Sequence, residues 1–255
     1  MMRSQLWTED DARHYERNHA DRFDDAVLGP TVDFLSTLVA DAAKGHDPRA
    51  LELAIGTGRV AMPLHSRGVR VAGIELSEPM VAKLREKATP EEIPVTIGDM
   101  STATGPPPGP GRFHLVYLVY NTISNLLTQD AQVDCFANAA RHLHPGGFFV
   151  IENFVPDLRR LPPGQGAVPC VLTDDHLNID TIDTVSQRLM SHHFRRHENG
   201  SWSRSESEHR YVWPAELDLM ARIAGLELVN RVADWDRSVF DEASGSAVSV
   251  WRRLD

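Results

Sequence analysis

The stretch from Leu51 to Arg59 constrains the fold of this chain more than any other, because an apolar segment with one acid runs directly into two glycines. The apolar part predicts a buried strand, and the residues after Gly58 predict the start of a helix. Bare backbone at Gly56 and Gly58 allows positive φ and lets a ligand approach the amides closely. An ordinary strand-to-helix turn can contain the same glycine pair, so the following segments must decide between a plain turn and a ligand cradle.

Two further predicted strands also end in polar or glycine residues. Val69–Ile74 is largely apolar and runs into Glu75, at the distance from the glycine loop where a carboxylate that binds ribose hydroxyls is found. A third short strand, Val95–Ile97, runs into the polar segment Gly98–Met100. Open α/β sheets bind ligands at the carboxyl ends of their parallel strands. We therefore expect a nucleoside-binding site where these three strands end.

These segments together resemble the class I S-adenosylmethionine-dependent methyltransferases, over roughly residues 50–155. Glu52–Gly58 is similar to the first motif of that family, Glu75 to its ribose-binding acid, and Asp99-Met100 to its adenine-contacting pair. The turn Pro145–Gly147, before a predicted fifth strand, is also typical of the family. The resemblance implies an α/β fold with a Rossmann-like sheet of seven strands and helices on both faces. It also implies S-adenosylmethionine as methyl donor and S-adenosylhomocysteine as product.

One position departs from the family pattern, because Ala54 stands where the fuller pattern has its first glycine. We expect its methyl group to narrow the pocket without abolishing it. The resemblance implies a set of donor-binding residues spread over the N-terminal helix and the ends of the first four strands. They are Tyr15, Glu52, Ala54, Gly56, Gly58, Glu75, Leu76, Met80, Asp99, Met100 and Tyr120.

The segment Gly56–Ala61 also fits the Gly-x-Gly-x-x-Ala form of the dinucleotide fingerprint, so an NAD(P)-dependent oxidoreductase is an alternative. Glu52 beside the loop would repel a pyrophosphate, whereas it suits the ammonium and sulfonium groups of S-adenosylmethionine. The second acid at Asp99 favours the methyl donor in the same way. A non-catalytic module that binds S-adenosylmethionine is a third reading, which these motifs do not exclude.

Composition and charge narrow the class of protein. With 255 residues and 42% hydrophobic residues, the chain can form one elaborated α/β domain. A net charge of −10 argues against a nucleic-acid substrate, and two cysteines do not make a disulfide framework. The first ten residues lack the apolar core of a signal peptide, and we see no stretch that approaches membrane-spanning length. We expect a cytoplasmic protein without membrane contact.

Four parts follow along the chain: an N-terminal helical lid (residues 1–45), the donor-binding core (46–155), an insert (156–213) and a return to the core sheet (214–255). Helical periodicity runs from about Glu9 to Ala43, and Tyr15 within it either covers the donor or simply packs. Ser77 is expected to cap a helix of the core. After the insert, a helix over Pro214–Ala224 precedes the two final strands.

Residues between Val168 and Trp213 tend to alternate, for example from Ile179 to Val185, and Glu198–Gly200 predicts a turn. This pattern predicts an antiparallel meander of three or four strands inserted after the fifth strand. Such an insert resembles the one in small-molecule methyltransferases of bacterial secondary metabolism, including amino-sugar N-methyltransferases, where it roofs the active site and can form a dimer interface. That resemblance implies a small-molecule acceptor and a monomer or homodimer.

Methyl transfer from a sulfonium is an in-line displacement, so the protein must mainly hold the nucleophile, the methyl carbon and the sulfur in line. A neutral amine attacks directly, whereas an oxygen or carbon nucleophile needs a nearby base, and the sequence leaves nitrogen, oxygen and carbon open. The ends of the fourth and fifth strands are expected to line the acceptor side, with Tyr120 and Asn121 as first choices for catalysis. The acceptor-side candidates are Asn121, Asn125, Glu152, Asn153 and Phe154.

The chain has 12 histidines, and His192, His193 and His197 loosely resemble a metal-binding spacing. Neighbouring side chains on a strand point to opposite faces, and two arginines follow directly, so we expect no metal site. His209, His193 and His176 are equal candidates for a base contributed by the insert. Of these, His209 is taken as the catalytic candidate.

Overall fold

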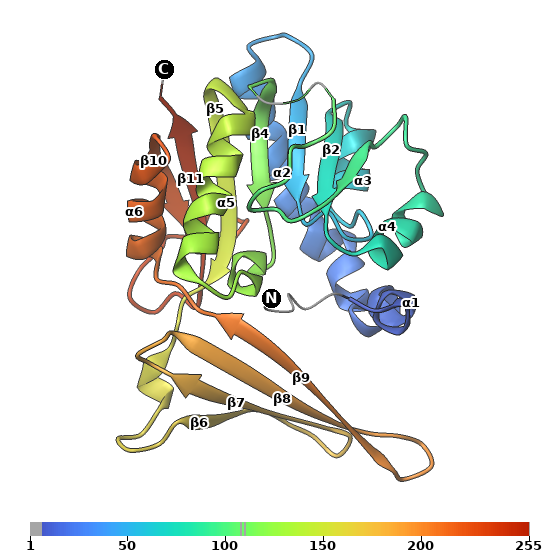
Figure 1. The fold of residues 1–255 in the computed structure, drawn as a ribbon, viewed down its shortest axis with the longest axis vertical. Helices are drawn as coiled ribbons and strands as arrows, with labels where there is room; N and C mark the ends of the chain where they lie inside the picture. The colour runs from blue at the N-terminus through green and yellow to red at the C-terminus, as the bar shows by residue number, and fades with distance from the viewer. Residues whose placement is uncertain (1–6, 108, 110, 255) are drawn as a thin grey trace.

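A computed structural model describes residues 7–107, 109 and 111–254, and in them two separate sheets stand out (Figure 1). The first six residues of the expected lid therefore lie outside the described chain. The large sheet has seven strands in the order β10-β11-β5-β4-β1-β2-β3. Its strands are β1 (Arg49–Leu53), β2 (Arg70–Glu75), β3 (Val95–Ile97), β4 (Phe113–Leu118), β5 (Leu143–Phe154), β10 (Leu226–Val232) and β11 (Ser246–Arg253). The predicted fold class is confirmed.

The order of the strands fixes where a ligand can bind. The chain builds β1, β2 and β3 outward in one direction and then continues with β4 and β5 on the other side of β1, all as parallel neighbours. The direction therefore reverses between β1 and β4, which is where open α/β sheets form their ligand crevice. The last strand, β11, runs antiparallel to both β5 and β10.

Helices cover both faces of the large sheet and divide its core in two. One face packs against α2 (Asp25–Ala43), α3 (Ala61–Ser66) and α4 (Glu78–Arg85), with Leu35 and Leu64 fully buried. The other face packs against α5 (Gln129–His142) and α6 (Pro214–Ile223), with Phe136 and Leu217 fully buried. Each such side chain contributes roughly 1.5–3 kcal/mol by leaving water. Ser77 caps α4 as predicted, because its Oγ accepts from the Met80 amide at 3.4 Å.

The N-terminal segment is helical over most of the range from Glu9 to Ala43, as the periodicity predicts. It divides into α1 (Glu9–Asn18), the 3-10 turn η1 (Ala20–Phe23) and α2, because Asp24 is extended and begins a new helix. The expectation that no stretch reaches membrane-spanning length is wrong, since α2 has 19 residues and a mean hydropathy of 1.3. Its buried side chains pack on the sheet, and core helices of soluble proteins commonly meet the same criterion.

The insert is a four-stranded antiparallel meander in which consecutive strands pair. Its strands are β6 (Ala167–Leu172), β7 (His176–Asp183), β8 (Arg188–Arg196) and β9 (Trp202–Arg210). The predicted turn before β9 is present, with Gly200 at φ +79°. Val185 was expected on a strand, but it lies in the turn after β7 and is 94% exposed. In this turn the Val185 amide donates to the Asp183 carboxylate at 2.9 Å in place of a strand partner.

A buried arginine joins the insert to the core. Arg210, at the end of β9, is 4% exposed and donates to Gln187 and Glu216, each at 2.7 Å. Its other nitrogen donates to Gln132 of α5. In Figure 1, β9 is the strand of the insert nearest to the large sheet, and it contacts the 3-10 turn η2 (Thr122–Asn125) that follows β4.

Candidate functional site

Three acids lie at or near the carboxyl ends of neighbouring parallel strands. Glu52 is on β1, Glu75 ends β2, and Asp99 follows β3. The glycine loop after β1 and the segment after β4 lie on opposite sides of the point where the strand order reverses. The structure thus brings the predicted donor-side acids to one edge of the sheet.

Glu52 is the most buried of these acids, at 3% exposure. The Tyr117 hydroxyl donates to its Oε2 at 2.9 Å. Burial raises the pKa of Glu52 to about 8, although the Tyr117 hydrogen bond and the charge of Arg59 act against that rise. A carboxyl group of this kind is mostly protonated at pH 7, and a cationic ligand beside it would favour the ionised form.

Glu75 ties the end of β2 to the glycine loop and to α4. One carboxylate oxygen accepts from the Gly56 amide at 2.8 Å, and the other accepts from the Ser77 amide, also at 2.8 Å. Burial raises its pKa, while these backbone donors lower it. Each oxygen has a second lone pair, so the carboxylate can still accept from two vicinal hydroxyls of a ligand.

Asp99 is fixed by its own turn, because its Oδ1 accepts from the Ser101 amide at 2.8 Å and the Ser101 hydroxyl at 2.6 Å. Met100 beside it is buried, and its carbonyl accepts from Asn138 of α5 at 2.8 Å. Met80 is buried next to the glycine loop, whereas Leu76 is half-buried.

The glycine loop owes its composition to packing as well as to ligand access. Gly58 has φ +80°, and a Cβ there would lie 2.5 Å from Leu84 Cδ1 of α4. Gly56 has φ +57°, and a Cβ there would be in ordinary contact with Met80, at 3.5 Å. Ala54 also takes a left-handed conformation, with φ +55°, a conformation that suits the glycine of the family pattern that Glu52–Gly58 resembles.

The end of β4 is held in an unusual conformation. Tyr120 and Asn121 both have positive φ, at 59° and 54°. Glu152 of β5 fixes them, because its carboxylate accepts from the Tyr120 amide at 2.6 Å and its carbonyl accepts from the Asn121 amide at 3.0 Å. The Asn121 Oδ1 in turn accepts from the Phe154 amide at 3.0 Å. Two adjacent left-handed residues are strained, and such strain clusters at functional sites.

A hydrogen-bonded chain joins this strained turn to the insert. Asn121 Nδ2 donates to Ser124 Oγ at 3.2 Å, and that oxygen lies 3.3 Å from His209 Nδ1. Burial lowers the pKa of His209. The structure therefore links Asn121 to His209 through Ser124. Ser124 was not predicted as a site residue, because an isolated serine in a loop gives no sequence signal.

The remaining acceptor-side candidates take different positions. The Phe154 ring lies edge-on to Tyr120, with centroids 5.9 Å apart. Asn125 is half-buried on η2. Asn153 is fully buried, and as the neighbour of Glu152 on a strand it points to the opposite face. Glu152 and Asn153 therefore do not line one surface together.

Side chains of the N-terminal segment and of the glycine loop gather over the strand ends. The Cζ atom of Arg22 in η1 lies 3.7 Å from the Tyr120 ring centroid, and the Cζ atom of Arg59 lies 5.8 Å from the same centroid. Burial raises the pKa of Tyr15, with Arg59 and Arg22 opposing and Glu52 adding to the rise. Neither arginine was predicted as a site residue, although Arg59 directly follows the glycine loop.

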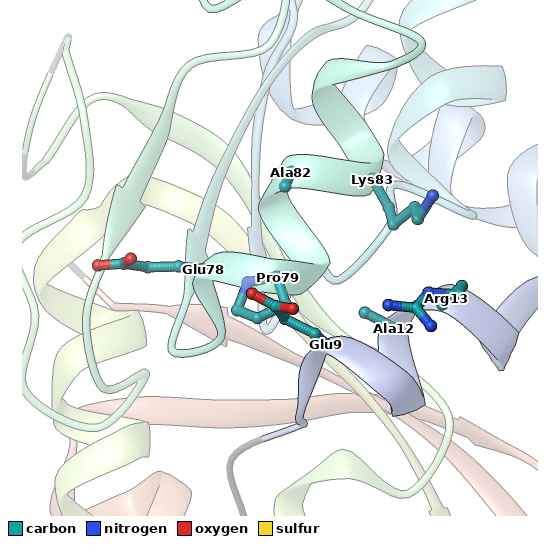
Figure 2. A pocket seen from close by; sticks show the side chains of 7 residues that line it. All are labelled: Glu9, Ala12, Arg13, Glu78, Pro79, Ala82 and Lys83. Carbon is teal, nitrogen blue, oxygen red and sulfur yellow. The ribbon is translucent and has the colours of Figure 1, made fainter.

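Two hollows of the surface lie beside this site. One, of about 370 Å³, runs between α1 and α4 (Figure 2) and includes neither Glu52 nor Glu75. Another, of about 700 Å³, borders the segment after β5 and includes Trp213 and Phe240. Since Glu52 and Glu75 are 3% and 6% exposed, a ligand reaches them only after the covering side chains move.

The three histidines with a metal-like spacing, His192, His193 and His197, do not gather around one point. His192 and His193 pair with neighbouring residues of β7 and so point to opposite faces of the sheet. Among the residues that the structure describes, no group of three or more His, Cys, Asp and Glu side chains is arranged to hold a metal ion.

Comparison with known proteins adds a family to this geometry. The family model described as "Methyltransferase domain" matches residues 50–147, from β1 into the beginning of β5. The solved structure of the CcbJ methyltransferase from Streptomyces caelestis is 35% identical, with each chain covered over 100% of its length and a TM-score of 0.83.

Two curated proteins show similarity over shorter lengths. The cypemycin N-terminal methyltransferase of Streptomyces sp is 27% identical over 183 residues, which span 70% of this chain and 72% of that protein. The dTDP-3-amino-3,4,6-trideoxy-alpha-D-glucopyranose N,N-dimethyltransferase of Streptomyces venezuelae is 31% identical over 144 residues, which span 54% and 58% of the two chains.

Proposed function

Because the chain belongs to the S-adenosylmethionine-dependent methyltransferases, we propose that it transfers the methyl group to an amine nitrogen of a small molecule. The names of two relatives support nitrogen as the methylated atom, one at an N-terminus and one on an amino sugar. Family membership also decides against the NAD(P)-dependent oxidoreductase and against a module without activity.

The donor-side residues fit S-adenosylmethionine by their chemistry. Bound there, the donor supplies an electrophilic methyl group on a sulfonium. Glu52 would hold its positive charge, Glu75 would accept from the ribose hydroxyls, and Asp99 with Met100 would contact the adenine. Ala54, Gly56 and Gly58 would supply the backbone of the cradle, with Leu76, Met80, Tyr15 and Tyr120 closing around it.

The acceptor would lie between the β4 turn and the insert. Tyr120 and Asn121 would orient the amine, with Asn125 and Phe154 beside them, while Glu152 acts as a positioning residue for the turn. A neutral amine attacks without a base and loses its proton afterwards, so His209 would take that proton at Nε2 or Nδ1. Burial favours its neutral form, which suits this role.

The same proposal assigns roles to the four parts of the chain. Residues 1–45 would cover the donor, 46–155 bind it, 156–213 cover the acceptor or join two copies, and 214–255 complete the core sheet. We further propose a cytoplasmic enzyme, a monomer or homodimer, that uses no metal and whose partner is its small-molecule acceptor.

One observation carries this proposal above the others. The strained Tyr120-Asn121 turn faces the glycine loop across the point where the strand order reverses, and a hydrogen-bonded chain links it to His209. The donor and acceptor sites would therefore lie side by side at the carboxyl ends of β1 and β4, one at the glycine loop and the other at the Tyr120-Asn121 turn.

The test is a methylation assay with S-adenosylmethionine carrying a trideuterated methyl group. Pairs of acceptors differ only in an amine or a hydroxyl at the same carbon, and mass spectrometry of the products locates the label. We expect the label on nitrogen, with transfer reduced at least about tenfold in Asn121→Gly, which keeps the left-handed backbone and removes the amide. Label on oxygen or carbon alone would contradict the proposal.

A further inference from the structure

The insert presents one polar face that the proposed methyl transfer uses only at His209. Directly paired residues of antiparallel strands share a face, so Asn178, His193 and Ser205 form one row across β7, β8 and β9. The next row contains Asp180 and Ser191. We call this surface the histidine face, and its polar members are His176, Asn178, Asp180, Ser191, His193, Arg195, Ser203, Ser205, Ser207 and His209.

The histidine face begins at the candidate site. At one end, His209 Nδ1 lies 3.3 Å from Ser124 of η2. Toward the other end, Arg195 of β8 is near enough for its charge to contribute to the lowered pKa of His19. The His19 ring packs on Tyr15, with centroids 4.9 Å apart. The face therefore extends from the β4 turn toward the N-terminal segment that covers the donor side.

Asn178 is the unusual member of this face. It is 7% exposed, and its Nδ2 donates to Asp180 Oδ1 at 3.0 Å, an oxygen that also accepts from Ser191 at 2.7 Å. Its own Oδ1 has no hydrogen-bond partner among the residues that the structure describes. A buried carbonyl oxygen without a donor is destabilising, so this atom is a natural acceptor for a ligand hydroxyl.

Two histidines are neighbours of Asn178 on this face, His193 as its partner on β8 and His176 two residues before it on β7. His176 Nε2 is 3.3 Å from His193 Nδ1, and the two rings stack with centroids 5.6 Å apart. Burial lowers the pKa of both side chains, so both are mainly neutral near pH 7. A neutral imidazole offers one donor and one acceptor, which matches a hydroxyl group. Arg195, which pairs with His176, adds a charged donor toward the far end of the face.

The opposite face of the same strands is built differently. There, His192 bonds to Glu206 at 2.8 Å, and Arg204 pairs with the same carboxylate. The Arg204 and Glu206 side chains are 58% and 43% exposed, as expected of a solvated surface. The contrast makes His192 a matched control for its neighbour His193.

We propose that the histidine face binds hydroxyl groups of the acceptor through His193, His176 and Asn178, so that the substrate is a hydroxylated, amino-sugar-like amine. This inference rests on the proposed function and specifies its substrate class. It assigns His193 to substrate specificity and leaves the chemical step to the β4 turn.

The experiment compares glucosamine, galactosamine and mannosamine with cyclohexylamine, a primary amine on a six-membered ring without hydroxyls. Steady-state methylation is measured for the wild type, His193→Ala, His193→Asn and His192→Ala. For at least one amino sugar we expect the wild type to have a KM about tenfold below its KM for cyclohexylamine. His193→Ala should raise the KM for that amino sugar about tenfold with little change in kcat. His193→Asn should restore part of the lost affinity, because asparagine can still form a hydrogen bond. His192→Ala should keep the wild-type KM and kcat for the amino sugar, and the KM and kcat for cyclohexylamine should be the same in all four proteins.

A second readout is independent of turnover. With S-adenosylhomocysteine bound, the amino sugars should shift the imidazole NMR signals of His176 and His193, while cyclohexylamine should not. If methylation fails although these signals shift, the proposed function is wrong and the hydroxyl site stands. Equal KM values for both kinds of amine, or histidine signals that ignore the amino sugars, would overturn the inference.

Discussion

Single residues in unfavourable environments mark the candidate site. The Glu52 carboxyl group is almost fully buried. Ala54 has a left-handed backbone conformation, and so do the adjacent residues Tyr120 and Asn121. The glycines and acids of the donor side were predictable because their spacing follows the strand-loop-helix pattern that nucleotide-binding α/β folds share. The two strained residues after β4 were predictable only as strand-end residues, since no sequence pattern records the Glu152 hydrogen bonds that hold them.

Glu52→Gln should stabilise the protein in neutral and weakly alkaline solution. The folded pKa of Glu52, about 8, lies above its ordinary value of 4.5, so the wild type loses stability as the pH rises from about 4.5 to about 8. The glutamine variant has no such loss, and its Oε1 still accepts from Tyr117. Urea unfolding between pH 5 and 8.5 should show a gain on the order of a few kcal/mol that grows with pH. A pH-independent difference, or the same gain in the exposed Glu227→Gln, would contradict this.

Ala54→Gly should also stabilise the fold, by about 0.5–1 kcal/mol, because glycine removes the steric cost of φ +55° while losing some chain entropy on folding. Ala82→Gly, within α4, is the control and should destabilise by about 1 kcal/mol. Thermal unfolding of the two variants measures both effects. Equal destabilisation in both would show that the left-handed backbone of Ala54 carries no strain.

At the level of helices and strands, the predictions held wherever one periodic pattern was bounded by a clear start or stop. β3 matches its predicted bounds, and Ser77 caps α4. The helical range from Glu9 to Ala43 was predicted without its break at Asp24, because the charged residues of this segment give no clear stop signal. The hydrogen-bonded chain through Ser124 depends on how the insert meets η2, a long-range contact that a single sequence does not encode locally.

Gly58→Ala tests why this glycine is needed. Its Cβ would meet Leu84 at 2.5 Å at a positive φ, so we expect a loss of roughly 2 kcal/mol in the free energy of unfolding. Leu84→Ala removes the clash, and Gly58→Ala should then cost about 1 kcal/mol less than in the wild-type background. Additive losses in the double variant would mean that the packing of α4 does not explain Gly58.

Over the whole molecule, the sheet order, the insert and the N-terminal helices together build a site that none of them contains alone. The alternating pattern between Val168 and Trp213 predicted the insert and its place in the chain. It did not show how the insert is attached to the core, because the contacts of Arg210 join residues far apart in sequence.

Arg210→Ala should uncouple the insert from the core. The change leaves Glu216, only partly exposed, without its arginine, and breaking a buried pair of this kind costs roughly 3–5 kcal/mol. We expect the wild type to unfold in one calorimetric transition and the variant to show an earlier transition for the insert. A single transition in the variant, lowered by less than 1–2 °C, would show that Arg210 does not join the two parts.

The claim that most needs testing is that the donor binds at the ends of β1, β2 and β3. Calorimetric titration with S-adenosylhomocysteine addresses it without knowledge of the acceptor, in the wild type, Glu75→Gln, Asp99→Asn and the surface control Glu227→Gln, each checked for folding by circular dichroism. We predict saturable binding in the wild type and the control, a loss of at least about tenfold in the two site variants, and no heat from NAD or NADP. Unchanged affinity in both site variants, or dinucleotide binding in place of S-adenosylhomocysteine, would contradict this account.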